Sequence, residues 1–239
     1  MRTAVIVQAR MGSTRLPGKV MRDISGRPMI DRVVERARRI PAVDGVAVAT
    51  SSEPVEEPLV AHLRKSGVPV HRGPEADVLS RFVGAVDRFE VHTIVRITAD
   101  CPLLMPEVSG RVLDRYREGG CDYASNTLER TYPRGLDTEV LGRQSLERAA
   151  DEATEPGDRE HVTPYLRRHP ELFDLCSVTS ETDRSELRWT VDEEADLELV
   201  RRVYELLPDP MAGYGNVLKI FEDRPELKEI NRQVRQRGP

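Results

Sequence analysis

Hydrophobic positions along the first half of the chain follow two spacings, one typical of buried strands and one typical of amphipathic helices. Residues 3–9, TAVIVQA, form a short apolar run rich in β-branched side chains, and residues 44–51, DGVAVATS, form another. Residues 28–40, PMIDRVVERARRI, instead place apolar side chains three and four positions apart with charges between them. The first pattern predicts strands buried on both faces, and the second predicts a helix that covers them.

The same alternation continues to about residue 120. Strands are predicted over 68–73 and 91–100, and helices over 56–67, 77–89 and 106–120. With the first elements, these segments make four strand-then-helix units. This repeat is typical of an α/β fold with a mainly parallel sheet.

The pattern changes after Cys121. The elements expected there are loop and strand segments over 121–127 and 132–142, helices over 142–153 and 159–170, strands over 173–180 and 186–192, a helix over 193–207 and a helical tail over 217–235. No internal repeat or low-complexity linker divides the chain. We therefore expect a single domain over residues 1–239.

Composition narrows the class of protein. The chain of 239 residues is 38% hydrophobic and 32% charged, with a net charge of -5. It contains no apolar run near the roughly 20 residues that span a bilayer, and no hydrophobic segment typical of a signal peptide. The three cysteines are scattered, without metal-binding spacing, as is typical of a reducing compartment. We expect a cytoplasmic protein that binds neither membranes nor, given its acidic charge, nucleic acid.

The segment that follows the first predicted strand, QARMGSTRLPGKV over 8–20, is too charged for a plain turn. In open parallel sheets, ligands bind beyond the carboxyl ends of the strands, which is where this loop should lie. Its small, hydroxyl and basic residues are Arg10, Gly12, Ser13, Thr14, Arg15, Gly18 and Lys19. Backbone amides and fixed cations in this mixture suit a triphosphate. The alternative is a solvated basic turn.

The loop differs from two common phosphate-binding motifs. Gly18 and Lys19 are followed by Val20, whereas the pattern G-x-x-x-x-G-K-[ST] requires a hydroxyl residue there. The pattern G-x-G-x-x-G is also missing. A P-loop and a dinucleotide site are therefore both disfavoured.

Two aspartates follow predicted strands and are candidates for a metal site. Asp100 ends the strand predicted over 91–100, and Asp192 ends the strand predicted over 186–192. Either residue alone could instead cap a turn or a helix. Together they provide the one or two carboxylates with which proteins hold Mg²⁺ beside substrate phosphates.

Several motifs together resemble one enzyme family. The segment VQARMGSTRLPGKVM is similar to the nucleotide-binding loop of cytidylyltransferases that activate acidic sugars, such as the acylneuraminate and 3-deoxy-manno-octulosonate enzymes. The whole chain more closely resembles spore-coat polysaccharide-biosynthesis cytidylyltransferases. The other stretches that carry the likeness are VATSSEP, EADVLSRF, VRITADCPLL, YPRGLDTEV, REHVTPYLRRHPELF and RPELKEIN. The resemblance runs from about residue 3 to residue 232.

The resemblance implies a glycosyltransferase-A-like nucleotidyltransferase fold, with a Rossmann-like, mixed but mainly parallel sheet of seven strands and flanking helices. It implies transfer of CMP from CTP to an acidic acceptor, release of pyrophosphate, a need for Mg²⁺ and a homodimer. It also divides the chain into a nucleotide-binding half over 1–120, an acceptor and dimerisation region over 121–175, and closing strands and C-terminal helices over 176–239.

The resemblance further assigns roles to positions of this chain. The implied nucleotide-binding residues are Ala9, Arg10, Gly12, Ser13, Arg15, Lys19, Thr50, Ser51 and Thr98. Arg15, Lys19, Asp100 and Asp192 are the implied catalytic residues, and the two aspartates are the implied metal ligands. The implied acceptor-binding residues are Arg134, Asp137, Glu160 and His161. Thr98 departs from the acidic-sugar enzymes, which carry Gln in a V-Q-G-D segment.

Three alternatives to CMP transfer stay open at this point. A glycosyltransferase of the same fold would more often carry an Asp-x-Asp motif, and the sequence contains none. A sugar-1-phosphate nucleotidyltransferase would use another nucleotide, and a non-catalytic relative would keep only the pocket. The acceptor itself could be a keto-acid sugar, a sugar phosphate or a phosphonate.

Overall fold

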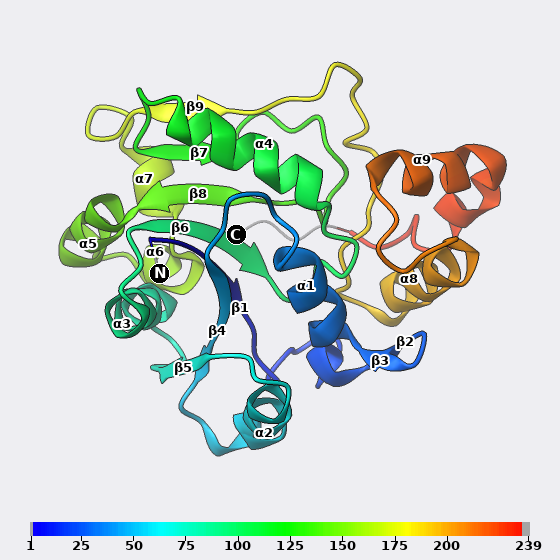
Figure 1. Cartoon of the computed structure of the whole chain (residues 1–239), viewed down its shortest axis with the longest axis horizontal. Helices are drawn as coiled ribbons and strands as arrows, with labels where there is room; N and C mark the ends of the chain where they lie inside the picture. Colours follow the sequence, from blue (N-terminus) through cyan, green and yellow to red (C-terminus); the bar gives the residue numbers. More distant parts are fainter. Residues whose placement is uncertain (1, 236–239) are drawn as a thin grey trace.

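The structure is a computed structural model that describes residues 2–235, which form a seven-stranded sheet with helices on both faces (Figure 1). From one edge to the other, the strands are β5 (Val70–Gly73), β4 (Gly45–Ser51), β1 (Thr3–Gln8), β6 (Thr93–Thr98), β8 (Glu139–Gly142), β7 (Tyr123–Ser125) and β9 (Leu175–Ser177). The first four strands are parallel, so their carboxyl ends meet at one edge.

The remaining strands make the sheet mixed. β8 runs antiparallel to both β6 and β7, and β9 is parallel to β7. Because β8 is reversed, its first residue, Glu139, lies beside Arg96 near the carboxyl end of β6. The predicted mixed, mainly parallel α/β fold is confirmed.

Two hydrophobic clusters cover the two faces of the sheet. Along β1, Val5 and Val7 point into one cluster while Ala4 and Ile6 point into the other. This alternation follows from the two-residue period of a strand, and it explains why the run is apolar throughout.

The helices divide between these clusters. The first cluster takes apolar side chains from α1 (Met29–Ala37), α2 (Glu57–Lys65), α4 (Pro106–Arg117), α8 (Glu194–Leu206) and α9 (Tyr214–Asp223). The second takes them from α3 (Val78–Phe89), α5 (Arg143–Glu152) and α7 (Pro164–Arg168), and from Val162, which follows α6 (Pro156–His161). In the described part of the chain, no helix is both long and apolar enough to cross a membrane.

The strand predicted over 186–192 is wrong. In the described structure this segment makes only an isolated bridge between Arg134 and Arg188. Its amides instead serve two separate loops, since Trp189 donates to the Arg134 carbonyl (2.7 Å) and Val191 donates to the Asp100 carbonyl (2.8 Å). The apolar residues Leu187, Trp189 and Val191 alternate as in a strand, but the backbone has no continuous strand beside it.

The single helix predicted over 159–170 is also wrong. α6 ends at His161, Val162 has a φ of 73°, and α7 begins only at Pro164. Pro164 has no N–H group to continue the helical hydrogen bonds, and its ring clashes with a helix that runs through it. Beyond the break, the Thr163 hydroxyl donates to Glu139 at the start of β8.

Shorter elements complete the chain. The sequence patterns missed a hairpin of β2 (Asp23–Ile24) and β3 (Arg27–Pro28), because two-residue strands leave no detectable period. The predicted helical tail is divided between α9 and a 3-10 turn, η3 (Pro225–Glu229). Two more 3-10 turns, η1 (Lys19–Met21) and η2 (Pro54–Glu56), lie next to the site described below.

Gly135 joins the segment 186–192 to the rest of the fold. Its φ is 103°, and a Cβ built on it would lie 2.5 Å from the Thr190 nitrogen and 2.7 Å from the Trp189 carbonyl carbon. Only glycine fits both the conformation and the space. The contact brings Arg134 and Asp192 to the same end of the sheet.

We expect Gly135→Ala to lower the free energy of unfolding by about 3 kcal/mol, because the methyl group adds overpacking to an unfavourable φ. Chemical denaturation measures the change. The matched control is Gly157→Ala in α6, where a Cβ meets nothing within 4 Å; it should stay within about 0.5 kcal/mol of the parent. Equal stabilities for the two variants would contradict the close approach.

Candidate active site

A cleft of about 730 Å³ opens at the carboxyl ends of β1 and β6. One side consists of the loop after β1, and the other consists of side chains from the segment 127–139 and from α6 and α7. Its size is that of a small-ligand site. The position is the one expected for an open parallel sheet.

The loop after β1 is held in a compact turn. The amides of Ser13 and Gly18 both donate to the Met11 carbonyl at 2.9 Å, and buried Leu16 anchors the loop to the core. Gly18 has a φ of 67° and directly precedes η1, so the chain reverses there and directs Lys19 into the cleft. The glycine is needed because this left-handed conformation is costly for other residues.

The Lys19 ammonium group joins the two candidate metal ligands. Nζ lies 3.3 Å from Asp100 Oδ2 and 2.9 Å from Asp192 Oδ1, and it donates to the Val191 carbonyl at 2.7 Å. Burial would lower the pKa of Lys19, but the charges of Asp100 and Asp192 raise it above its ordinary value. The site therefore favours a cation between two carboxylates.

Asp192 is surrounded by basic groups. Its Oδ2 lies 3.0 Å from Arg15 Nη2 and 2.8 Å from Arg188 Nη2. Burial opposes ionisation, but Lys19, Arg188 and Arg15 together bring the pKa of Asp192 below its ordinary value. The helix-cap alternative is excluded, because Glu193 and Asp196 form the capping box of α8.

Asp100 is fixed at the end of β6. The Thr98 hydroxyl donates to its carboxylate, and its backbone carbonyl accepts hydrogen bonds from Val191 and from the Thr190 hydroxyl. These contacts link the two aspartates, although 91 positions separate them in the sequence. Thr98 lines the cleft, but its hydroxyl is already committed to Asp100.

The residues present fit a magnesium ion. Two carboxylates that already share one cation provide the hard oxygen ligands that Mg²⁺ takes, with phosphate oxygens and water completing its shell. In the described residues no group of three or more His, Cys, Asp or Glu could hold a metal. The protein alone therefore offers an incomplete metal site, which suits an ion that arrives with a phosphate ligand.

The opposite side of the cleft is rich in arginine. Arg130 forms a bidentate pair with Asp137, at 2.7 and 2.8 Å. Arg96 pairs with Glu139, and it also donates to the Gln8 side chain at 2.7 Å. Both carboxylates that line this side are therefore neutralised within the protein.

Glu139 is held in a buried network. The hydroxyls of Tyr123 and Thr163 both donate to Oε1 of its carboxylate. Burial would raise the pKa of Glu139, but Arg96 and the two hydroxyls bring it below its ordinary value. The Glu139 carboxylate is thus occupied by contacts within the protein.

The structure brings most of the predicted site residues together. Those that line the cleft are Ala9, Arg10, Ser13, Arg15, Lys19, Thr98, Asp100, Arg134, Asp137, His161 and Asp192. Four others do not line it: Gly12, Thr50, Ser51 and Glu160. Thr50 and Ser51 are fully buried, and Glu160 is exposed on α6.

Sequence reasoning missed three cationic residues of the cleft: Arg96, Arg130 and Arg167. Arg96 had a detectable signal, because it interrupts the otherwise uncharged strand TIVRIT. Arg130 and Arg167 had none, since arginines are frequent in this chain and only the fold shows which of them face inward.

Buried Glu56 explains where Thr50 and Ser51 belong. Its carboxylate accepts hydrogen bonds from the Thr50 hydroxyl at 2.9 Å and from the Ser51 hydroxyl at 3.3 Å. Both of its oxygens also accept from the Met11 amide, at 2.9 and 3.0 Å. The carboxylate thus links the end of β4 to the loop after β1. The two hydroxyls stabilise the loop indirectly, by holding the carboxylate that accepts from Met11.

Comparisons with known proteins identify the family of the chain. The family model described as cytidylyltransferase matches residues 4–218. Spore coat polysaccharide biosynthesis protein SpsF of Bacillus subtilis (strain 168) is 34% identical over 229 residues, which are 92% of this chain and 94% of that protein.

Two solved structures are also similar. A cytidylyltransferase from Leptospira borgpetersenii serovar Hardjo-bovis (strain JB197) has a TM-score of 0.91 at 28% identity, covering 99% of this chain and 100% of that one. CMP:2-keto-3-deoxy-manno-octonic acid synthetase complexed with CTP has a TM-score of 0.65 at 21% identity, covering 86% of this chain and 99% of that one, and it shows likeness of fold.

The fold and the cleft therefore define a nucleotidyltransferase. Within that class, the chain belongs to the cytidylyltransferase family.

We expect Glu56→Gln to lower the free energy of unfolding by about 1–3 kcal/mol. An amide at this buried position cannot accept all the hydrogen bonds that the Glu56 carboxylate accepts from Met11, Thr50 and Ser51. Hydrogen exchange at the Met11 amide should accelerate in the folded protein. The matched control is Glu53→Gln, an exposed position of the same segment, which should change neither quantity. Unchanged protection of Met11 in Glu56→Gln would show that the carboxylate does not hold the loop.

Proposed function

We propose that the protein transfers CMP from CTP to a small anionic acceptor and releases pyrophosphate, in a reaction that requires Mg²⁺. The observation that carries the proposal is the Lys19 ammonium group between Asp100 and Asp192, at the end of a basic, glycine-containing loop. Family membership supports the nucleotidyl transfer, and the CTP named for a solved structure of the same fold supports the nucleotide.

The loop residues would bind the triphosphate. Arg15 and Lys19 would turn from the carboxylates toward the β- and γ-phosphates, where the lysine acts as a point charge and the arginine as a fork. Arg10 and Ser13, which also line the cleft, would add a charge and a hydroxyl. These groups stabilise the pyrophosphate as it leaves.

Asp100 and Asp192 would hold the metal ion. When bound, Mg²⁺ supplies charge neutralisation at the α-phosphate and orients the reacting oxygens. An acceptor oxygen in its ionised form, which has no proton to lose, attacks the α-phosphorus; the bond from that phosphorus to the bridging oxygen breaks, and pyrophosphate takes the electron pair. Catalysis of this kind depends on positioning and electrostatics more than on covalent help from the protein.

The remaining predictions concern the acceptor and the assembly. Arg134, Asp137 and His161 line the side of the cleft opposite the loop after β1, which we call the acceptor side. Their position supports their predicted role, whereas Glu160 lies outside the cleft. Thr50 and Ser51 would act on the nucleotide through Glu56 and the loop. A homodimer remains a prediction from the resemblance, and a cytoplasmic location remains a prediction from composition and cysteine usage.

The first test is the change in heat stability with CTP, UTP, ATP and GTP, each with and without Mg²⁺. A ligand that binds only the native state stabilises it by about 2.7 kcal/mol at 100 times its Kd. We expect the largest shift with CTP and Mg²⁺ together. A shift with UTP and none with CTP would favour a glycosyltransferase or a sugar-1-phosphate enzyme, and no shift with any nucleotide would contradict the proposal.

Lys19, Asp100 and Asp192 form an ion cluster. Single substitutions in it should separate binding of the phosphates from binding of the metal. Lys19→Ala should weaken CTP binding at least about tenfold, since a charged contact to phosphate is lost. Asp100→Asn should still bind CTP but lose the additional affinity that Mg²⁺ provides. Calorimetric titration of CTP, with and without Mg²⁺, measures both effects.

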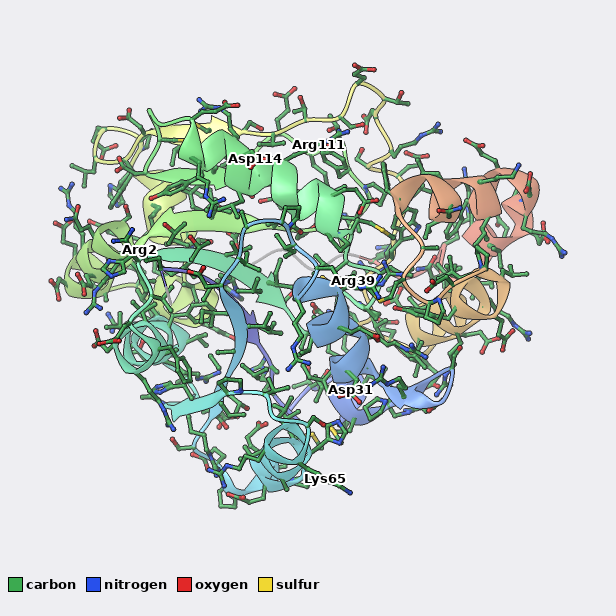
Figure 2. All side chains as sticks on the ribbon, viewed as in Figure 1. Arg2, Asp31, Arg39, Lys65, Arg111 and Asp114 are labelled. Atoms are coloured by element: carbon green, nitrogen blue, oxygen red, sulfur yellow. The ribbon has the colours of Figure 1, made fainter. Side chains whose placement is uncertain are left out.

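The chain offers matched controls for both variants. Lys65 at the end of α2 and Asp114 on α4 are exposed, and Figure 2 shows both on the outside of the molecule. Lys65→Ala and Asp114→Asn should bind CTP and Mg²⁺ as the parent does. If Lys19→Ala or Asp100→Asn behaved like its control, the assigned site would be incorrect.

A further inference from the structure

The acceptor side of the cleft has an excess of positive charge. Four guanidinium groups line it, those of Arg96, Arg130, Arg134 and Arg167. The carboxylates that line the same side are Asp137 and Glu139, and each is already paired, with Arg130 and Arg96 respectively. Of the four arginine charges, two therefore remain uncompensated by these carboxylates.

Arg167 is one of the two uncompensated groups. In the described part of the chain it forms no ion pair, and its Nε is buried without a hydrogen-bond partner. Its charge acts on Glu139 only at a distance, as a minor influence on the pKa of that carboxyl. A buried N–H group without an acceptor costs about 1–3 kcal/mol, which an incoming oxygen atom would recover.

Arg134 is the other uncompensated group. Its backbone is fixed on both sides by the segment 186–192, at 2.9 Å to the Leu187 carbonyl and 2.7 Å from the Trp189 amide. Its guanidinium forms no ion pair with any carboxylate that the structure describes. Burial lowers the pKa of Arg134, and the charge of Arg130 lowers it further, against the smaller opposing effect of Asp137.

We propose that this side of the cleft binds a tetrahedral dianion, the phosphate-monoester or phosphonate group of the acceptor, and that Arg134 and Arg167 hold it. Two uncompensated guanidinium groups match a dianion, whereas a carboxylate would leave one of them unbalanced. The fork of an arginine also fits the oxygens of a phosphoryl group. The inference rests on the proposed function only in taking this ligand to be the acceptor.

The test uses small probes on the full chain. Cytidine α,β-methylene triphosphate with Mg²⁺ first fills the nucleotide side without reacting, and calorimetry then follows titration with methylphosphonate, methyl phosphate or acetate. At a pH where the first two are dianions, we expect both to bind at least about tenfold more tightly than acetate. Whichever of the two binds more tightly identifies the source as a phosphonate or a phosphate ester.

Variants assign the binding to the two arginines. Arg134→Gln and Arg167→Gln should each lower the affinity for the dianion at least about tenfold, while the affinity for the nucleotide analogue stays unchanged. The matched control is Arg39→Gln, an exposed arginine just beyond α1, labelled in Figure 2, which should change nothing. If a glutamine variant does not fold, Arg134→Lys and Arg167→Lys replace it. These variants should lower the affinity for the dianion without abolishing its binding.

Three results would overturn the inference: acetate binding as tightly as the dianions, no binding of any probe, or dianion binding that both arginine variants leave intact. A failure of the proposed function gives a different pattern. If the cytidine analogue does not bind, the same titrations on nucleotide-free protein should still show the preference for dianions and its loss in the variants.

Discussion

The contact between the Lys19 ammonium group and the carboxylates of Asp100 and Asp192 is the interaction on which the site depends. It joins the loop after β1, the end of β6 and the segment before α8, three parts of the chain that are distant in sequence. Because the ammonium lies between two carboxylates, their charges raise the pKa of Lys19, and the charge of Lys19 helps to lower the pKa of Asp192. A ligand that brings phosphates and a divalent cation can replace these contacts with equivalent ones.

Two further constraints hold that cluster in place from behind. Glu56 fixes the loop through the Met11 amide, and Gly135 lets the segment 186–192 pass close enough to carry Asp192 to the end of β6. Neither residue lines the cleft. Their effect on the site is therefore one of position.

Charge is distributed unevenly between the two sides of the cleft. On the loop side, Arg15 and Lys19 are paired with Asp192 and Asp100, so the cations are held ready and can be released to a stronger anion. On the far side, Arg134 and Arg167 have no such partner in the described structure. The first arrangement suits exchange of ion pairs on nucleotide binding, and the second suits a permanent receptor for an anionic group.

The sequence by itself determined the sheet, the loop and the identity of the ion cluster. A short apolar run rich in β-branched residues, such as Thr3–Gln8, is typical of a strand buried on both faces, and the mixture of glycine, hydroxyl and basic residues in 8–20 suits phosphate. Tertiary structure alone decided the rest. The path of 186–192, the burial of Thr50 and Ser51 beneath the loop, and the inward direction of Arg130 and Arg167 all depend on contacts between distant segments, and local periodicity carries no information about those contacts.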